Sequence, residues 1–276
     1  MSTQSPVIAP TKQAVVTPRP ASQRAAHSPI PFSRLLKVEL VKMFNTRSGV
    51  WLIASIGILA ALATLGVLLF GSLETINYSS FASAVGVPTA IILPILGLLT
   101  VTSEFSQRTG LTTFTMVPSR SRVVAAKLLV TVGVGVVAIL AACAIGAVGN
   151  LLGAGINGIT PIWEFALADL AMVVLANVLG MLMGFALGVL VRNTPAAVVG
   201  YFVYSLVLPN VLGALAFYQE WFHDIWPWVD FFYSTTSLFE GVPSAEGWAQ
   251  LAVSGSVWMV LPMLLGVRLM LRTEVK

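Results

Sequence analysis

The sequence of 276 residues has few charged residues, two histidines and a single cysteine. Charged residues make up 9% of the chain, whereas a soluble domain is roughly a quarter charged. A single cysteine, Cys143, excludes an intrachain disulfide and a cysteine-based metal cluster. His27 and His223 cannot supply a His-Glu-x-x-His zinc site. These absences argue against a soluble domain and against a metalloenzyme.

A glycine-rich loop ending in Gly-Lys-Ser or Gly-Lys-Thr is also absent from the sequence. The chain therefore lacks the usual means of holding ATP phosphates. Too few ionisable groups fall within the apolar runs to suggest a proton or ion relay. No catalytic constellation is visible, so we expect no enzymatic activity and no cofactor bound by this chain.

Apolar residues, by contrast, form 57% of the chain and gather in long runs. About 20 such residues in a helix cross the hydrocarbon layer of a bilayer. Six runs reach that length: 50–71, 85–103, 128–150, 165–191, 196–217 and 248–266. Inside a bilayer the backbone must satisfy its own hydrogen bonds, so such runs are helices. The sequence predicts an all-α integral membrane protein with six transmembrane helices.

Basic residues occur in every second connection between these runs. After the N-terminal region they fall only before span one, between spans two and three, between four and five, and after six; the other three connections carry acidic residues, namely Glu74, Glu164, Glu220, Asp224, Asp230, Glu240 and Glu246. This is the positive-inside pattern. It predicts both termini on the cytoplasmic side of a bacterial-type plasma membrane. The formal net charge of +4 then reflects topology, and we expect no nucleic-acid partner.

The region before span one has two parts. Residues 1–31 are rich in Ser, Pro, Ala, Thr and Gln, which predicts a disordered cytoplasmic tail. This tail has the pattern of neither a signal peptide nor a span. Residues 32–276 form the predicted transmembrane domain. Residues 32–47 would place Phe32, Leu36, Leu40 and Met43 along one side of a helix, with Glu39 interrupting that stripe. The pattern favours an interfacial amphipathic helix with its bases near anionic headgroups. The alternative is that these bases only set the topology.

Within the spans, prolines, glycines and a few polar residues stand out. Pro88 and Pro94 predict a kink or an irregular outer end in span two. Span four has three glycines at four-residue spacing, Gly180, Gly184 and Gly188, which favours close helix packing, with the lining of a moving pathway as the alternative. Asn177 lies mid-span, where a packing hydrogen bond is favoured over a substrate ligand. Asp169 lies near the outer end of that span.

The longest connection, residues 218–247, is dense in aromatic residues. It interleaves two acids, Asp224 and Asp230, with Trp221, Phe222, Trp226, Trp228, Phe231, Phe232 and Tyr233. Aromatic residues favour the membrane–water interface. We expect short interfacial or partly re-entrant helices that cap the bundle on the outside, with His223 exposed. A cation-binding cup made of the acids and rings is the alternative.

The connection between spans two and three, residues 104–127, is the most polar. Glu104 falls where the second helix leaves the membrane, and Pro118-Ser119-Arg120 predicts a turn. Ser119 or Ser121 would cap the helix of span three. The pattern predicts a short cytoplasmic helix, a turn and the next span, which suits docking to a cytoplasmic partner. The alternative is an ordinary polar loop.

Several of these residues together resemble a known family. The connection after span two resembles the corresponding segment in ABC-2 type membrane subunits of ATP-binding cassette transporters, through Glu104, Arg108-Thr109-Gly110, Pro118-Ser119-Arg120 and Lys127. The segment before span one resembles the same family through Glu39-Leu-Val-Lys42 and Arg47. The resemblance covers residues 32–276. It implies a connecting helix with Lys37, Glu39, Lys42 and Arg47. It also implies a coupling segment that touches the ATPase through Glu104, Phe105, Arg108, Thr109, Gly110 and Phe114.

The function that follows is a permease subunit, with a preference for export. The resemblance implies a separate ATP-binding cassette ATPase that carries ATP and Mg, and a second permease subunit, identical or different, in the lipid bilayer. The rival is an ATP-independent secondary transporter or channel, which predicts polar residues deep in several spans and an internal repeat; the sequence shows Asn177 and Asp169 and no convincing repeat. A membrane scaffold or sensor is a third hypothesis. The substrate is not indicated, although apolar walls would suit a lipid, a peptide or an amphiphilic drug.

Overall fold

A computed structural model describes residues 30–45, 47–106 and 120–272 of the chain. The chain divides into two units, residues 1–30 and residues 31–276, and the second unit contains every element described below. The described residues are helical or irregular and contain no strand.

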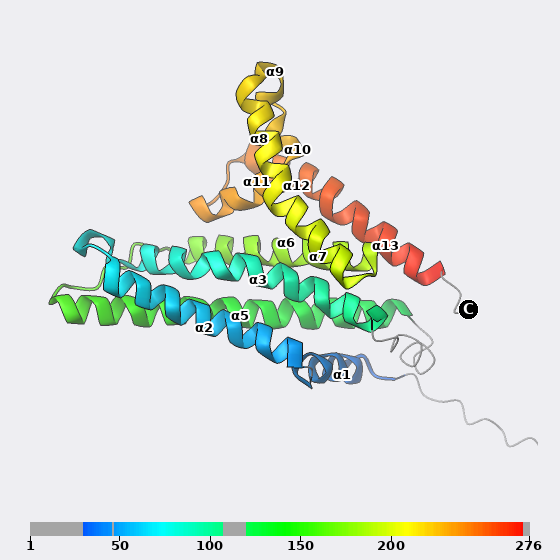
Figure 1. The fold of residues 1–276 in the computed structure, drawn as a ribbon, viewed down its shortest axis with the longest axis horizontal. Helices are drawn as coiled ribbons and strands as arrows, with labels where there is room; N and C mark the ends of the chain where they lie inside the picture. Colours follow the sequence, from blue (N-terminus) through cyan, green and yellow to red (C-terminus); the bar gives the residue numbers. More distant parts are fainter. Residues whose placement is uncertain (1–29, 46, 107–119, 273–276) are drawn as a thin grey trace, which may run out of the picture. The chain divides into compact units, whose positions relative to one another are not determined.

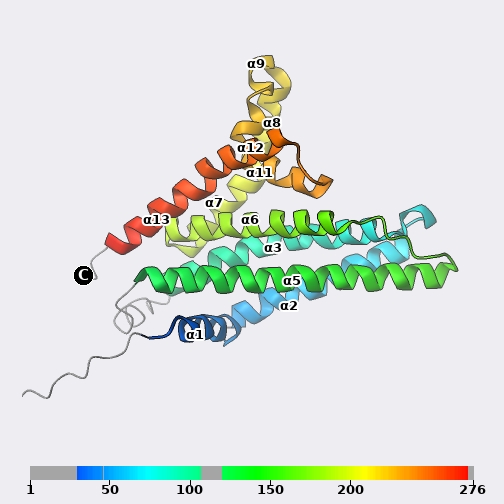
Figure 2. The same cartoon turned by 180° about the vertical axis from the view of Figure 1, so that it is seen from behind.

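The first half of this unit consists of one short helix and four long ones (Figure 1). In chain order these are α1 (Phe32–Asn45), α2 (Arg47–Phe70), α3 (Tyr78–Ser106), α5 (Arg120–Asn157) and α6 (Leu167–Val191), with a 3-10 turn, η1 (Leu73–Thr75), after α2. Seen from behind, α2 lies along α5, and α1 lies beside the first part of α5 (Figure 2).

The second half contains two composite helices separated by short ones. The first is α7 (Thr194–Phe202), η2 (Val203–Val207) and α8 (Leu208–Tyr218), and the second is α12 (Ala245–Gly255), η4 (Ser256–Val260) and α13 (Leu261–Arg272). Between them lie α9 (Glu220–His223), α10 (Trp226–Val229), α11 (Phe231–Thr236) and η3 (Ser237–Glu240). The expected short helices are therefore present in the aromatic connection.

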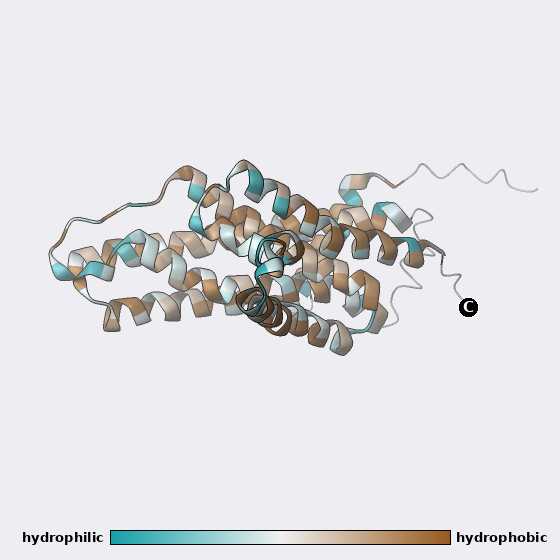
Figure 3. Cartoon of the chain, turned by 90° about the horizontal axis from the view of Figure 1, so that it is seen from above, coloured by the Kyte–Doolittle hydropathy of each residue, from teal (hydrophilic) through white to brown (hydrophobic). Residues whose placement is uncertain are grey.

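The described part of the chain contains six helices that are long and apolar enough to cross a membrane. They are Gly49–Phe70, Tyr78–Phe105, Ser121–Asn157, Leu167–Val191, Thr194–Tyr218 and Ala245–Leu271, and apolar residues predominate along them (Figure 3). The predicted number of spans and the all-helical class are confirmed. The helices run past the apolar runs at several ends, because a helical backbone satisfies its hydrogen bonds whether its side chains are apolar or not. Glu104 consequently lies within α3. Lys127 lies within α5, which begins at Arg120, between Ser119 and Ser121, the two residues predicted as its cap.

Helices α3 and α6 form the interior pair of the bundle. Half of the most apolar stretch of each is buried, against 17–22% in the other four spans. The glycine strip of α6 faces α3: a Cβ at Gly184 would overlap the carbonyl of Pro94, and one at Gly188 would lie 2.9 Å from the carbonyl oxygen of Leu98. The strip therefore has the packing role that its spacing favours. The sequence predicted a kink or an irregular outer end at Pro88 and Pro94. Helix α3 continues through both prolines, which excludes the irregular end and leaves the kink as a prediction.

The two composite helices share a feature that the sequence interpretation missed. Each contains a π-helical turn immediately before a Leu-Pro pair, Leu208-Pro209 in one and Leu261-Pro262 in the other. Proline has no N–H to continue the α-helical ladder. In each case the preceding leucine N–H bonds five residues back, to the carbonyl oxygen of Val203 and of Ser256 respectively. The sequence Leu-Pro-x-x-Leu-Gly occurs at both places, 208–213 and 261–266.

Candidate functional site

Four charged side chains from three helices meet in an ion-pair cluster, defined here as Glu39, Lys42, Glu104 and Lys127. Lys127 Nζ lies 2.6 Å from Glu39 Oε2 and 3.1 Å from Glu104 Oε1. Lys42 Nζ lies 2.8 Å from Glu39 Oε1 and 3.1 Å from Glu104 Oε1. Each lysine contacts both glutamates, so the charges of the cluster balance and the contacts close a ring.

The helices explain why these residues meet. Glu39 and Lys42 lie three residues apart on α1, a spacing that places them on one side of a helix. Glu104 lies in the last turn of α3, and Lys127 lies in the second turn of α5. Because α1 packs against the first part of α5 and α3 packs along it, the cluster connects all three helices.

Most of the cluster is buried. The side chains of Glu39 and Lys127 are 5% and 8% exposed, whereas that of Lys42 is 39% exposed. Burial alone would raise the pKa of Glu39, but the attraction and hydrogen bonds of Lys127 and then Lys42 outweigh it and hold that pKa below its usual range. Burial would likewise lower the pKa of Lys42, but Glu39 and Glu104 raise it above its ordinary value. Both shifts favour the ionised forms of Glu39 and Lys42, and pairing with opposite charges is how buried charges persist in proteins.

The residue next to Glu104 connects α3 to a different pair of helices. Phe105 packs with Val101, Phe185 and Val189, and the guanidinium of Arg192 lies 5.9 Å from the centre of its ring, within the range of a cation–π interaction. Arg192 ends α6 in a left-handed conformation, with φ of 56°, and its Nη2 donates to the carbonyl oxygen of Gly266 in α13 at 3.5 Å. Consecutive residues of α3 thus join it to α1 and α5 on one side and to α6 and α13 on the other.

The remaining predicted coupling and connecting residues lie elsewhere. Arg108, Thr109, Gly110 and Phe114 lie outside the described residues, as do Pro118 and Ser119. Lys37 of α1 and Arg47 of α2 are exposed and take no part in the ion-pair cluster.

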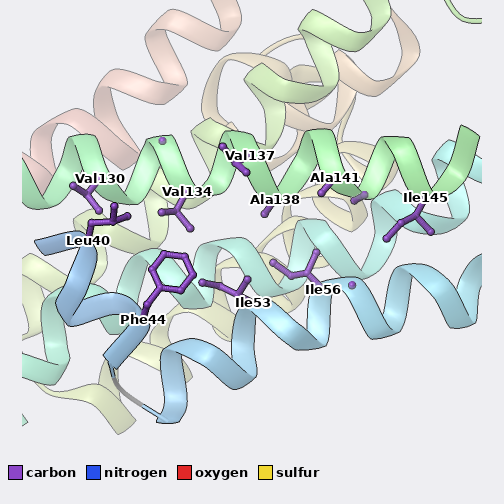
Figure 4. Close-up of a pocket in the computed structure, with 13 residues that line it drawn as sticks. Leu40, Phe44, Ile53, Ile56, Val130, Val134, Val137, Ala138, Ala141 and Ile145 are labelled. Atoms are coloured by element: carbon purple, nitrogen blue, oxygen red, sulfur yellow. The ribbon is translucent and has the colours of Figure 1, made fainter. Parts of the chain in front are cut away.

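Helix α1 also lines an apolar groove beside the cluster (Figure 4). The groove has a volume of about 570 Å³ and lies between α1, α2 and α5. Leu40 and Phe44 of α1 line it, with Phe44 pointing toward Ile53 and Val134 (Figure 4). The face buried against the bundle is instead formed by Leu35, Glu39 and Met43. The glutamate that interrupts the expected apolar stripe therefore lies on the packed side of α1, where Lys127 meets it.

Polar residues in and beside span four have structural partners. Asn177 Nδ2 donates to the carbonyl oxygen of Val173 in the same helix at 2.9 Å. Asp169 accepts a hydrogen bond from the backbone N–H of Ala166 at 2.8 Å and so caps the start of α6. Neither residue takes part in the ion-pair cluster.

The acids of the aromatic connection give no support to a cation-binding cup. Asp230 is 1% exposed, and its carboxylate accepts from Trp226 Nε1 at 3.0 Å and from the backbone N–H of Tyr233 at 3.1 Å. It therefore caps α11. Asp224 is exposed beside His223, which is exposed as expected. Among the residues that the structure describes, no group of three or more His, Cys, Asp or Glu side chains could hold a metal ion.

Lys127 is the member of the cluster that sequence reasoning did not single out as a site residue. A signal for it was present: Glu39 lies on an apolar stripe, and a buried carboxylate needs a cation. The sequence could not say which of the many basic residues supplies that cation, because the answer depends on how α1 packs.

The fold is that of a multi-pass helical membrane protein. Comparison with protein-family models and with curated proteins finds no match to the chain. The assignment of a function therefore depends on the sequence pattern and on the geometry of the ion-pair cluster.

Proposed function

We propose that the chain is the membrane-spanning permease subunit of an ATP-binding cassette transporter of the ABC-2 type, working as an exporter in a bacterial plasma membrane. The observation that carries the proposal is the ion-pair cluster. It joins the helix before span one to the two helices that flank residues 107–119, the segment with the family-like pattern. A connecting helix and a coupling segment need such a mechanical link if they are to move together.

The cluster suggests how force would pass into the bundle. A partner that binds between Glu104 and Lys127 would push on the ends of α3 and α5, and both ends hold α1 through ion pairs. Phe105 would carry the same displacement to α6 and α13 through Arg192. The conformational energy would come from ATP and Mg on the partner subunit, and a second permease subunit would complete the pathway.

Paired charge substitutions test this proposal. The chain is co-expressed with ATP-binding cassette ATPases from its own genome, and association and ATP turnover are measured in nanodiscs. We expect Glu104→Lys to lower the permease-dependent ATP turnover, because it places a third cation in the cluster. The double variant Glu104→Lys with Lys127→Glu restores the charge balance and should recover part of that turnover.

Glu246→Lys is the matched control, because Glu246 is an exposed acid in the first turn of α12, distant in sequence from the cluster. If Glu104→Lys and Arg108→Glu both leave ATPase association and coupled turnover intact, the docking assignment is wrong.

One observation favours the ATP-independent transporter as a second candidate. Four spans carry a buried polar atom without a hydrogen-bond partner among the described residues, namely Thr64 Oγ1, Thr102 Oγ1, Asn150 Oδ1 and Asn177 Oδ1. Polar groups inside membrane spans are a feature of transport pathways. Solute flux in proteoliposomes that contain this chain alone, driven by an ion gradient and without ATP, would favour this candidate over the first.

A further inference from the structure

Two adjoining, partly open cavities lie between helices of the unit formed by residues 31–276, and exposed residues, Ser83 and Val87 among them, line the larger one. The larger, of about 310 Å³, is lined by α3, α5 and α6 together with Phe165 and Phe239. The smaller, of about 70 Å³, lies between α3, α6, α7, η2, α11 and η3. Ala90, Asn177 and Phe239 line both of them. Asn177 therefore lies at the wall that the two cavities share.

The side chain of Asn177 has an unused hydrogen-bond acceptor at this wall. The residue is 3% exposed, and its Nδ2 donates to the carbonyl oxygen of Val173. A carbonyl can only accept, so this bond fixes which end of the amide is nitrogen. The other end, Oδ1, is buried and has no partner among the residues that the structure describes. A buried acceptor left without a donor is unfavourable, so a donor that reaches Oδ1 from one of the cavities would be stabilised.

The walls indicate what kind of donor fits. None of the described residues that line either cavity is charged. A cationic group would therefore lack a counter-charge within a membrane span, which is costly. The larger cavity is mainly apolar, with the hydroxyls of Ser79 and Ser83 one helical turn apart on α3. Its volume is at the lower end of the range for small-molecule sites, about 300–1,000 Å³.

We propose that these cavities bind a small neutral amphiphile whose hydroxyl group donates a hydrogen bond to Asn177 Oδ1, with its apolar part between α3, α5 and α6. The hydroxyl belongs either to a membrane lipid or to a free small molecule. The site needs no ATPase and no transport, and it does not depend on the proposed permease function.

Photolabelling of the full chain in nanodiscs tests the site. The probe is a benzyl alcohol that carries a trifluoromethyl diazirine, and its methyl ether, which cannot donate a hydrogen bond, is the matched control. We expect the alcohol to label peptides that contain residues 79–90 and 173–177 more strongly than the ether does. The difference should be about twofold to tenfold, the range that one hydrogen bond gives.

Two substitutions address the site in different ways. Asn177→Leu removes the acceptor at similar volume, and Ala90→Leu enlarges a side chain that lines both cavities. Both should reduce labelling by the alcohol to the level of the ether. Thr102→Val is the control, because Thr102 also has a buried hydroxyl without a described partner but lines neither cavity.

Equal labelling by alcohol and ether, or undiminished labelling of a folded Asn177→Leu variant, would overturn the proposal and leave water as the occupant. If Asn177→Leu does not fold, Ala90→Leu decides by the same criterion. Mass spectrometry of lipids extracted from the purified protein distinguishes the two sources. If a neutral hydroxylated lipid co-purifies with the native chain but not with the variants, the ligand is a membrane lipid. If no such lipid co-purifies and added free alcohol reduces labelling by the probe, the ligand is a soluble small molecule.

Discussion

Glu39 and Lys127 are 88 positions apart in the chain, yet they form the shortest ion pair of the cluster, at 2.6 Å. A buried ion pair contributes little net stability compared with apolar residues of the same shape, but removal of one partner leaves an uncompensated buried charge. The two residues therefore depend on each other far more than either depends on its exposed neighbours. This dependence makes the pair sensitive to single substitutions and to pH.

Lys127→Met should lower the free energy of unfolding by about 3–5 kcal/mol, because Glu39 would lose its buried partner. The double variant Glu39→Met with Lys127→Met should recover much of that loss. Thermal or denaturant unfolding of the purified chain in detergent measures both. Lys37→Met, at an exposed position of α1, should change stability by less than about 0.5 kcal/mol. A Lys127→Met variant as stable as the Lys37→Met control would contradict the account.

The pH dependence should follow the lowered pKa of Glu39. A carboxyl whose pKa is lower in the folded state than its ordinary value of 4.5 contributes stability above that value and loses the contribution as the pH falls through its folded pKa. We expect the native chain to be more stable than Glu39→Gln at neutral pH, and this difference to shrink as the pH falls below 4.5. Unfolding curves of both chains between neutral and acidic pH measure the change. A difference that stays constant over this range would show that the pKa of Glu39 is the same in the folded and unfolded states.

At the scale of elements, the two π-helical turns are the least regular parts of the spans, and they face each other. Tyr204 lies in the turn of η2 and Trp258 in that of η4, and their ring centres are 5.9 Å apart. Trp258 Nε1 also donates to the carbonyl oxygen of Val229 at 2.7 Å. Such turns are frequent at functional sites. Here they position two aromatic side chains against the short helices of the aromatic connection.

Pro262→Ala should convert the turn in η4 to a regular α-helix, because residue 262 would regain an N–H that can bond to the carbonyl of Trp258. Residues before the turn would then rotate by about 100° relative to those after it, one residue of helical twist. Cysteines at positions 204 and 258, in a Cys143→Ala background, should react with a short bifunctional thiol reagent in the native helix and much less in Pro262→Ala.

Pro161→Ala, in the connection before α6, is the control and should leave this cross-linking unchanged. Equal cross-linking with and without Pro262 would show that the π-helical turn does not depend on the proline.

At the scale of the whole molecule, the sequence predicted the number of spans because bilayer thickness sets the length of an apolar run. It did not predict where α3 and α5 end, because a helix continues where its backbone bonds continue. Glu39 could be recognised as an anomaly in α1, but its pairing with Lys127 depends on tertiary packing. The π-helical turns went unnoticed, although both copies of Leu-Pro-x-x-Leu-Gly were visible, because a short motif does not say how the backbone adapts to its proline.

The predicted topology can be checked directly with single cysteines in the Cys143→Ala background. The positive-inside pattern places Lys37 inside and Glu164 outside, and both positions are exposed. A membrane-impermeant maleimide should label Glu164→Cys in intact cells and should label Lys37→Cys only after permeabilisation. The opposite result would invert the topology and place the ion-pair cluster on the outer side, away from any cytoplasmic ATPase.

Each π-helical turn accommodates one residue more than an α-helix of the same length, since its hydrogen bond spans five residues instead of four. Spans five and six therefore carry a spare residue that the other spans lack in the described part of the chain. Deletion of one residue within 203–207 or 256–260 would tighten the turn while leaving the helix on either side intact. In α3 or α6 the same deletion would rotate the glycine contacts out of register. Spans five and six should therefore tolerate the loss of one residue, whereas α3 and α6 should not.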